Sequence, residues 1–345
     1  MADSPTETGA GESGRDRLAR LLSVVGPDRP TVVQAHDYPD IDAVASAWAL
    51  ASLLERRGCQ AQCTFHGQVR SRSLGRLIEE LGIVVSSDRG SPDCRIIVVD
   101  GSPSNGNVSL VDGQLAGVLD HHFSASAPTA PFIDIRPELA SCSTLIFGYW
   151  AAAGEDPPRG VATALLAGIQ SDTDFLSRRA SIEDYQAYTA LFELGDWDRA
   201  SRIVRTALDL RELGLIARAL ENATVRDGAL FAALDGPCGQ EALAVLAEFV
   251  IRAEELRAAA IVSRDEVGAH ISVRSKSPAL SAFALVRGTL AGLGTGGGHS
   301  HSAGGLVAPA ADPGDEVLKE RFFAAAAAAS IRLTEVPECR KRSDE

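Results

Sequence analysis

The sequence predicts an α/β protein. A parallel-sheet domain with helices on both faces should be followed by a helical linker and a smaller α/β domain. Short apolar runs alternate with amphipathic stretches from about residue 30, as in repeated βαβ units. Two later apolar runs both end in aspartate, which favours a parallel sheet. A second alternation of strand and helix patterns begins near residue 222 and indicates a second domain.

The first strand is expected at TVVQA, residues 31–35, and the first helix at DAVASAWALASLLERRG, where Gly58 is the stop signal. The strand AQCTF and the helix SRSLGRLIEELG, closed by Gly82, repeat this unit. Further strands are expected at RIIVVD, residues 95–100, and AGVLD, residues 116–120.

Helical spacing dominates next, in SCSTLIFGYWAAAG, RGVATALLAGIQ and SIEDYQAYTALFELG. One or two further helices are expected within residues 196–221. The expected divisions are a disordered leader over 1–16, a first domain over 17–195, a helical linker over 196–221, a second domain over 222–336 and a tail over 337–345.

The second domain begins with the strand-like run GALFAAL and a helix over 240–257. The stretch AAAIVSRDEVGAHISVRSK predicts two strands around a turn at Asp265 to Gly268. ALSAFALVRGTLAGL predicts a helix, and GTGGGHSHSAGG predicts a glycine-rich loop. A packed C-terminal helix is expected at residues 322–331, which are too few to span a membrane.

Composition excludes several classes of protein. A formal charge of −13 argues against a basic surface for long nucleic acid. The first residues are polar and lack the apolar centre of a signal peptide, so a cytoplasmic protein is expected. The scattered cysteines are interpreted as reduced and mostly structural. The sequence leaves open whether the chain forms a homodimer.

Charged residues gather where the predicted strands end. Three strand ends carry His36, Asp100 and Asp120. The adjoining segments add Asp40, Asp42, His121 and His122. Carboxyl ends of parallel strands converge, and carboxylates brought together resist ionisation unless a cation compensates. Imidazoles among them favour manganese, zinc or iron over calcium.

A plainer interpretation remains for part of this cluster. Asp37, Asp40 and Asp42 are also typical of turns and of a helix N-cap, and Asp42 is expected to open the first helix. The histidines weaken that alternative, because the three charged strand ends are jointly improbable as turn chemistry. His66 and His270 lack such neighbours and are interpreted as structural or surface residues.

Five motifs, taken together, resemble the DHH phosphoesterases with a DHH-associated C-terminal domain. They are HDYPDID, the VVD ending at Asp100, LDHH at 119–122, GIQSDTDFL at 168–176 and GGGHSHSAGG at 296–305. The resemblance spans nearly the whole chain after the leader and is closest to bacterial short oligoribonucleases and cyclic-dinucleotide phosphodiesterases.

The resemblance implies a two-metal centre. His36 and Asp40 would bind one ion; Asp42, His121 and Asp172 would bind the other; Asp100 would bridge them. Manganese is the expected ion, with magnesium or cobalt as alternatives.

The resemblance also implies catalytic roles around that centre. Asp120 would orient a ligand histidine, and His122 would face the substrate phosphate. Arg274 would assist from the second domain.

The second domain would bind substrate. Gly296, Gly297 and Gly298 allow backbone amides to approach an anion closely. The remaining expected donors are Arg274, Ser275, Lys276 and His299. The alternative for the glycine run is a flexible turn.

Four positions depart from the family pattern. Ile41 stands where a small residue is common, Asp174 where glycine is common, and Ser302 where alanine is common. DHHFSAS also lacks the asparagine often found after the two histidines. These departures leave the substrate open without removing a ligand.

The resulting hypothesis is a phosphodiesterase that hydrolyses short oligoribonucleotides or dinucleotides, linear or cyclic. One alternative is a phosphatase for nucleotides such as pAp. A manganese pyrophosphatase would share the first domain but lack the GGGH pattern. A non-catalytic nucleotide-binding regulatory protein is the alternative from another class, although every matching ligand position is intact.

Overall fold

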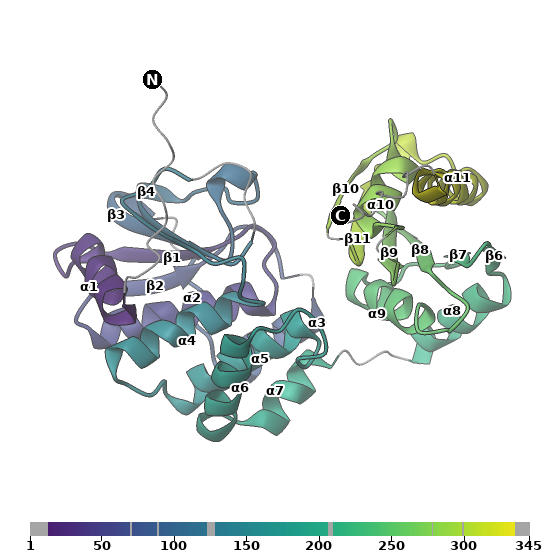
Figure 1. The fold of residues 1–345 in the computed structure, drawn as a ribbon. Helices are drawn as coiled ribbons and strands as arrows, with labels where there is room; N and C mark the ends of the chain where they lie inside the picture. The colour runs from purple at the N-terminus through teal and green to yellow at the C-terminus, as the bar shows by residue number, and fades with distance from the viewer. Residues whose placement is uncertain are drawn as a thin grey trace, which may run out of the picture. The chain divides into compact units, whose positions relative to one another are not determined.

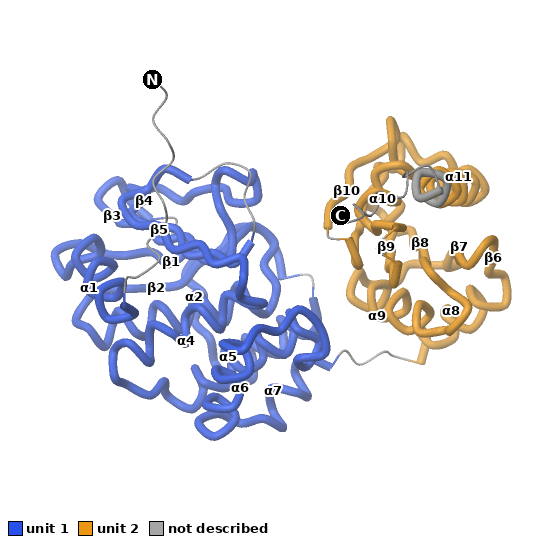
Figure 2. Tube along the Cα trace, in the orientation of Figure 1, with its two compact units in different colours: residues 1–205 blue, residues 206–345 orange. Residues whose placement is uncertain are grey.

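The computed structural model describes residues 13–69, 71–87, 90–122, 128–205, 210–277, 279–298 and 300–334, with side chains through residue 329. The chain divides into two compact units, residues 1–205 and 206–345 (Figure 2). Each unit has its own sheet and core, so the two are described separately.

Unit 1 contains a five-stranded sheet with the order β2-β1-β3-β4-β5, and every neighbouring pair is parallel. This confirms the predicted fold class. The strands are β1 (Thr31–Ala35), β2 (Ala61–Thr64), β3 (Gly90–Val99), β4 (Asp112–Asp120) and β5 (Phe132–Ile135). The sequence analysis did not predict β5, which has only four residues.

The strand order reverses at β1. The chain places β2 on one side of β1 and then crosses to place β3 on the other side. Such a reversal separates the connections that leave β1 and β3, and it opens a crevice at their carboxyl ends. The topology therefore locates a ligand site after β1 and β3.

Seven α-helices accompany this sheet within the described part of unit 1. They are α1 (Gly14–Val25), α2 (Ile41–Arg56), α3 (Arg72–Leu81), α4 (Cys142–Ala153), α5 (Arg159–Thr173), α6 (Ile182–Leu194) and α7 (Trp197–Val204). Helix α1 begins inside the segment expected to be a disordered leader; residues 1–12 lie outside the described part.

The main core lies between one face of the sheet and these helices. All seven contribute buried side chains to it, and α2 packs on β1, α4 and α5 (Figure 1). Leu50, Leu53 and Leu54 on α2 are fully buried. Each such side chain stabilises the fold by roughly 1.5–3 kcal/mol relative to exposure.

The opposite face differs from the prediction of helices on both sides. Its buried cluster contains residues of β1, β3 and β4, together with Val108 and Val111 from the β3–β4 connection. Gln34 ties that connection to β1, since it donates to the Ser109 carbonyl and accepts from the Val111 amide. The connection contains only the short helix η1 (Pro103–Asn105), so no α-helix is available there.

Unit 2 contains a six-stranded mixed sheet with the order β10-β11-β9-β8-β7-β6. Its strands are β6 (Thr224–Arg226), β7 (Ala229–Ala233), β8 (Ala258–Asp265), β9 (Gly268–Ser275), β10 (Thr295–Gly298) and β11 (Ser302–Val307). Its helices are α8 (Leu210–Glu221), α9 (Gln240–Val250), α10 (Ala282–Leu290), η2 (Pro309–Ala311) and α11 (Asp315–Thr334).

Helices cover both faces of this second sheet. The core with α10 and α11 is separate from the core with α8 and α9. The hairpin of β8 and β9 agrees with the predicted pair of strands. The helix expected over 240–257 ends earlier, at Val250.

The predicted glycine-rich loop is wrong for most of its length. Residues 295–298 form β10 and residues 302–307 form β11, paired antiparallel. Pairing with a neighbouring strand supplies hydrogen bonds that glycine-rich sequence cannot indicate by itself. The segment expected to link the domains is also divided: α7 packs on α5 in unit 1, whereas α8 belongs to unit 2.

None of the described helices is both long and apolar enough to cross a membrane. The described cysteines, which are Cys59, Cys63, Cys94, Cys142 and Cys238, are buried thiols.

Candidate metal centre

The predicted site residues gather at the carboxyl ends of three adjacent strands. His36 follows β1, Asp100 follows β3, and Asp120 ends β4 directly before His121 and His122. Because β1, β3 and β4 are neighbours and parallel, these ends meet at one edge of the sheet. That edge includes the place where the strand order reverses.

Side chains from two helices complete the cluster. Asp40 is the N-cap of α2, and its carboxylate accepts a 3.0 Å hydrogen bond from the Ala43 amide. Asp42 lies in the first turn of the helix. Of the aspartates that the sequence offered as a possible N-cap, Asp40 and not Asp42 caps α2. Asp172 lies near the end of α5 and is 20% exposed.

Three sets of three ligand atoms could each hold a metal ion, and atoms within each set lie within 4.8 Å of one another. One set comes from His36, Asp40 and Asp100, and a second from Asp42, His121 and Asp172. The third set, from Asp100, His121 and His122, shares Asp100 with the first and His121 with the second. Asp100 connects the first two sets. Its Oδ1 is 3.2 Å from His121 Nε2, and its Oδ2 is 3.8 Å from His36 Nε2.

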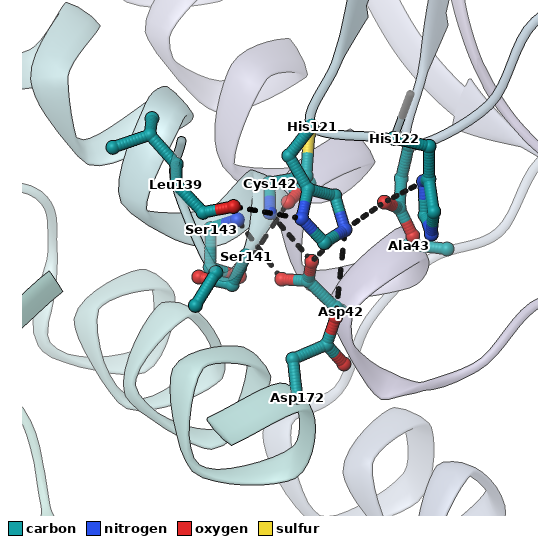
Figure 3. Close-up of polar contacts among 12 residues, drawn as sticks. Asp42, Ala43, His121, His122, Leu139, Ser141, Cys142, Ser143 and Asp172 are labelled. Atoms are coloured by element: carbon teal, nitrogen blue, oxygen red, sulfur yellow. Dashed lines mark hydrogen bonds and ion pairs between the residues drawn. The ribbon is translucent and has the colours of Figure 1, made fainter. Parts of the chain in front are cut away.

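The amino terminus of α4 holds the Asp42 carboxylate (Figure 3). The amides of Cys142 and Ser143 donate to its Oδ2 and Oδ1 over 2.7 and 2.9 Å. Helix α5 approaches on another side at Gly168, where a Cβ atom would lie 2.6 Å from Asp42 Oδ1 and would overlap Ser143 Oγ. This glycine is part of the arrangement, and sequence analysis gave it no role.

Backbone carbonyls orient two of the histidines. His121 Nδ1 donates to the Leu139 carbonyl at 3.3 Å, and His36 Nδ1 donates to the Asp37 carbonyl at 2.9 Å. A carbonyl oxygen only accepts, so each Nδ1 carries the proton and each Nε2 faces the carboxylates. His121 Nε2 also lies 3.5 Å from Asp172 Oδ2.

Asp120 organises the DHH segment in a different way from the one expected. Its Oδ1 accepts from the amides of His121 and His122 and from His122 Nδ1, at 2.8, 3.1 and 2.9 Å. The ring it orients is therefore that of His122, which is 36% exposed, and not the ring of His121. Residues 123–127, which include the departure at Phe123, lie outside the described part.

Backbone strain is concentrated around the centre. Asp100 has φ of 56° and Asp174 has φ of 47°, in the left-handed region that few non-glycine residues adopt. Such conformations persist where surrounding structure imposes them. Asp174 ends α5 as its C-cap, which explains physically why glycine suits this position.

The electrostatics of the cluster call for a cation. Burial and the neighbouring Asp100 raise the pKa of Asp42 to about 7, and burial with Asp42 and Asp40 raises the pKa of Asp172. Burial alone would lower the pKa of His121, but the carboxylates around it raise it to about 10. Without metal, the cluster is neutralised by binding protons.

Two buried atoms provide a further test of the fit. Asp100 Oδ1 and His121 Nε2 are inaccessible to solvent and, although they lie 3.2 Å apart, neither has a hydrogen bond of good geometry. Buried polar atoms almost always have a partner. The two atoms lie on the connection between the two ligand sets, and two divalent cations would match the charge of the four carboxylates, so these residues fit a metal pair.

The family model described as the DHH family, N-terminal domain, matches residues 30–169. The match runs from the start of β1 into α5 and includes His36, Asp40, Asp42, Asp100 and His121. Residues 30–169 are therefore similar to the N-terminal domain of the DHH family. Asp172, the last candidate ligand, follows the matched segment by three positions.

Curated relatives are similar over part of their length. An uncharacterized protein of Methanocaldococcus jannaschii is 29% identical over 284 residues, which cover 81% of this chain and 58% of that protein. A probable manganese-dependent inorganic pyrophosphatase of Shouchella clausii is 31% identical over 171 residues, covering 48% and 54%. The chain thus spans little more than half the length of these relatives.

Solved structures share the fold. An exopolyphosphatase-related protein of Bacteroides fragilis has a TM-score of 0.73 at 19% identity, covering 93% of this chain and 98% of that one. RecJ of Thermus thermophilus in complex with Mn²⁺ has a TM-score of 0.55 at 19% identity, covering 94% and 56%.

Unit 2 carries the other predicted residues at one end of its sheet. Ser302 on β11 pairs with Arg274 on β9, and the adjacent Ala303 pairs with Gly298 on β10. The structure therefore brings Arg274 and the end of the glycine run to the same end of the strands. His299 lies outside the described part of the chain.

The polar side chains near this end of the strands already have partners. Arg274 Nε donates to Glu248 at 2.9 Å, and Lys276 Nζ donates to the Ala253 carbonyl at 2.8 Å. The Ser275 hydroxyl contacts the Arg257 carbonyl and accepts from the Ser277 amide. A substrate would have to replace some of these interactions or use backbone donors instead.

Gly296, Gly297 and Gly298 differ in whether packing or backbone conformation requires a glycine. A Cβ at Gly296 would overlap Val286 on α10, and Gly298 has φ of 136°. At Gly297 a Cβ would meet nothing within 4 Å. Packing thus requires glycine at 296, and backbone conformation requires it at 298. Gly297 is the position of the three where neither explanation applies.

Proposed function

We propose that the chain is a two-metal-dependent phosphodiesterase that hydrolyses short oligoribonucleotides or dinucleotides, linear or cyclic. The observation that carries the proposal is the pair of ligand sets connected by the buried Asp100. Two-metal sites of this kind recur in enzymes that cleave phosphate esters.

The proposed ligands are His36 and Asp40 for one ion and Asp42, His121 and Asp172 for the other, with Asp100 between them. Mixed imidazole and carboxylate ligands favour manganese. The similarity to a probable manganese-dependent pyrophosphatase supports the same ion.

When bound, the metal pair supplies Lewis-acid polarisation of the phosphoryl group and lowers the pKa of a nucleophilic water. The chain's own residues hold the geometry. The α4 amides keep the Asp42 carboxylate in place, and Asp120 fixes the His122 ring through Nδ1, so that Nε2 can donate to a phosphoryl oxygen. Burial lowers the pKa of His122, but Asp120 and Asp100 raise it more, which favours that donor form.

Unit 2 is proposed to bind the rest of the substrate. The end of the strands with Arg274, Gly297 and Ser302 offers a guanidinium, backbone amides and a hydroxyl to a phosphate or nucleotide. Proposed donors there also include Ser275, Lys276, Gly296, Gly298 and His299. The formal charge of −13 supports a short substrate, because long nucleic acid requires many neutralised phosphates.

Inorganic pyrophosphate is a second candidate substrate. The 31% identity over 171 residues to a probable manganese-dependent pyrophosphatase favours it. A nucleotide phosphatase of the pAp type would use the same centre. The presence of His or Asp at every candidate ligand position, in groups that could hold a metal ion, argues against a loss of catalysis.

The test is hydrolysis with manganese of pApA, 5'-phosphorylated RNAs of two to five residues, cyclic di-AMP, pAp and pyrophosphate. Asp100→Ala should lower kcat/KM by about 10³-fold or more, since it removes a ligand common to both ions. Asp93→Ala, an exposed aspartate on β3, is the matched control and should leave activity unchanged. Turnover of pyrophosphate alone would refute the diesterase proposal.

A further inference from the structure

Asp184 is a fully buried carboxylate that is not one of the candidate metal ligands. It lies in the first turn of α6, beyond the segment that the family model matches. Its Oδ2 accepts from the amide and the hydroxyl of Ser181, over 2.8 and 2.6 Å, which closes the capping box of this helix. A capping box explains an acidic residue here but not its complete burial, because buried carboxylates need several partners. Asp184 has two further contacts, both outside α6.

The first contact leads to His121 through one peptide group. The Ala140 amide donates to Asp184 Oδ2 at 3.0 Å. The Leu139 carbonyl accepts from His121 Nδ1 at 3.3 Å (Figure 3). This N–H and this C=O belong to the same planar peptide unit, so an acceptor that holds the N–H also fixes the direction of the C=O. A charged acceptor polarises the carbonyl as well, which strengthens the hydrogen bond to the imidazole.

The second contact leads to Asp42. The Thr144 hydroxyl, in the first turn of α4, donates to Asp184 Oδ1. Backbone amides of the same turn hold the Asp42 carboxylate. Each oxygen of Asp184 thus fixes a backbone segment that contacts a different ligand. Both ligands belong to the second set, which consists of Asp42, His121 and Asp172.

We propose that Asp184 is a positioning residue that holds His121 and Asp42 in the geometry for one ion of the pair, an inference that rests on the metal centre of the proposed function. The other ion has different supports. The Asp37 carbonyl orients His36, and Asp40 accepts from the Ala43 amide. Loss of the Asp184 charge should therefore weaken the binding of the two ions unequally.

The test is manganese binding by the full chain, measured by calorimetry as two separate affinities. Asp184→Asn leaves one acceptor oxygen in place of two, so either the Thr144 hydroxyl or the backbone amides lose their acceptor. One ion should bind about tenfold more weakly, at the lower end of the usual loss because Asp184 acts through the backbone. The other ion should change less than about twofold. The weakened ion should be the one that Asp172→Asn weakens most, since Asp172 belongs to the second set alone.

Ser181→Ala is the matched control. It removes the hydroxyl that caps α6 and donates to Asp184, but it leaves both contacts that lead to the ligands. The midpoint of thermal unfolding should fall, while both manganese affinities stay within about twofold. This control separates a loss of stability from a loss of positioning.

A spectroscopic measurement on the metal-free chain tests the contact through the peptide directly. The Nδ1 proton of His121, observed by NMR, should shift upfield in Asp184→Asn, because the Leu139 carbonyl becomes a weaker acceptor. Thr144→Val is a milder second variant, which removes one donor to Asp184 and leaves the Ala140 amide bound. It should leave this resonance in place and weaken the same ion by about threefold.

Equal weakening of both ions by Asp184→Asn, unchanged affinities, or an Nδ1 resonance that stays in place would overturn the positioning role. None of these measurements requires turnover. Selective weakening of one ion in a chain that hydrolyses no diester would support the positioning role and refute the proposed function alone.

Discussion

Polar residues lie together at one end of the strands in unit 1 and at one end of the strands in unit 2. The two groups differ in the hydrogen bonds that their side chains make. In unit 1 the carboxylates and imidazoles are oriented by backbone groups, and three of their buried atoms, Asp100 Oδ1, Asp120 Oδ2 and His121 Nε2, lack a hydrogen bond of good geometry. In unit 2 the side chains of Arg274, Ser275 and Lys276 make hydrogen bonds within the unit.

The ligands in unit 1 are already oriented to bind a cation. In unit 2, the side chains must rearrange before they can bind a substrate, or backbone amides must bind it instead. Ligands held in advance cost little reorganisation when an ion binds. Side chains that already have partners must exchange them, so their net contribution to substrate binding is smaller. We therefore expect substitutions in unit 1 to have larger effects than substitutions in unit 2.

Among substitutions that leave every candidate ligand in the sequence, the largest effect is expected from breaking the support of Asp42. Gly168→Ala would place a methyl group against the Asp42 carboxylate and Ser143. Manganese affinity, measured by chelator competition, should fall about 10- to 100-fold. Gly148→Ala on α4 is the control, because a Cβ there meets nothing within 4 Å and should stabilise the helix by about 0.5–1 kcal/mol. Equal affinity in the two variants would show that Asp42 needs no such support.

A smaller effect is expected at Asp120, which orients His122 and not a ligand histidine. Asp120→Asn should lower kcat about tenfold or more while manganese affinity stays within about threefold. Since Asp120 raises the pKa of His122, its neutralisation should also move the alkaline limb of the pH profile of kcat to lower pH. A parallel loss of manganese would instead mean that Asp120 supports the metal ligands.

In unit 2 one glycine substitution should lower the stability of the fold, and another should weaken substrate binding. Gly296→Ala creates an overlap with Val286 and should lower the free energy of unfolding by about 1–3 kcal/mol. Gly297→Ala has open space and should leave stability within about 0.5–1 kcal/mol but raise the KM for a dinucleotide several-fold. Denaturant unfolding and steady-state kinetics measure the two; an unchanged KM would remove Gly297 from the proposed substrate site.

The smallest effect is a difference in pH dependence between the two units in metal-free protein. The pKa of Asp42, raised to about 7 by burial, means that the folded state holds its proton more tightly than the unfolded state. Its contribution to stability is present below pH 4 and is lost as the pH rises toward 7.

Asp312 in unit 2 contributes with the opposite sign to Asp42, as does Asp100 in unit 1. Arg264 lowers the pKa of Asp312, so that pair contributes stability above pH 4 and loses it as the pH falls further. Thermal unfolding in a chelator between pH 3 and pH 8 should show these opposing trends. Added manganese should reverse the first trend, since metal binds the deprotonated ligands. Identical trends in both units would contradict the assignment.

The sequence alone determined the elements that carry the site. Apolar periodicity predicted β1, α2, β3 and β4, because local pattern records which face of an element is buried. The same pattern placed His36, Asp100 and Asp120 at strand ends, where parallel topology makes them converge.

Only the tertiary structure decided how those residues are held. The amides that bind Asp42 lie about 100 positions later, and the carbonyl that orients His121 belongs to Leu139, so no local pattern could indicate either contact. The β10 strand forms because β11 pairs with it, although glycine has low strand propensity. Sequence determines which groups are available, whereas long-range packing determines which of them meet and which remain open to a ligand.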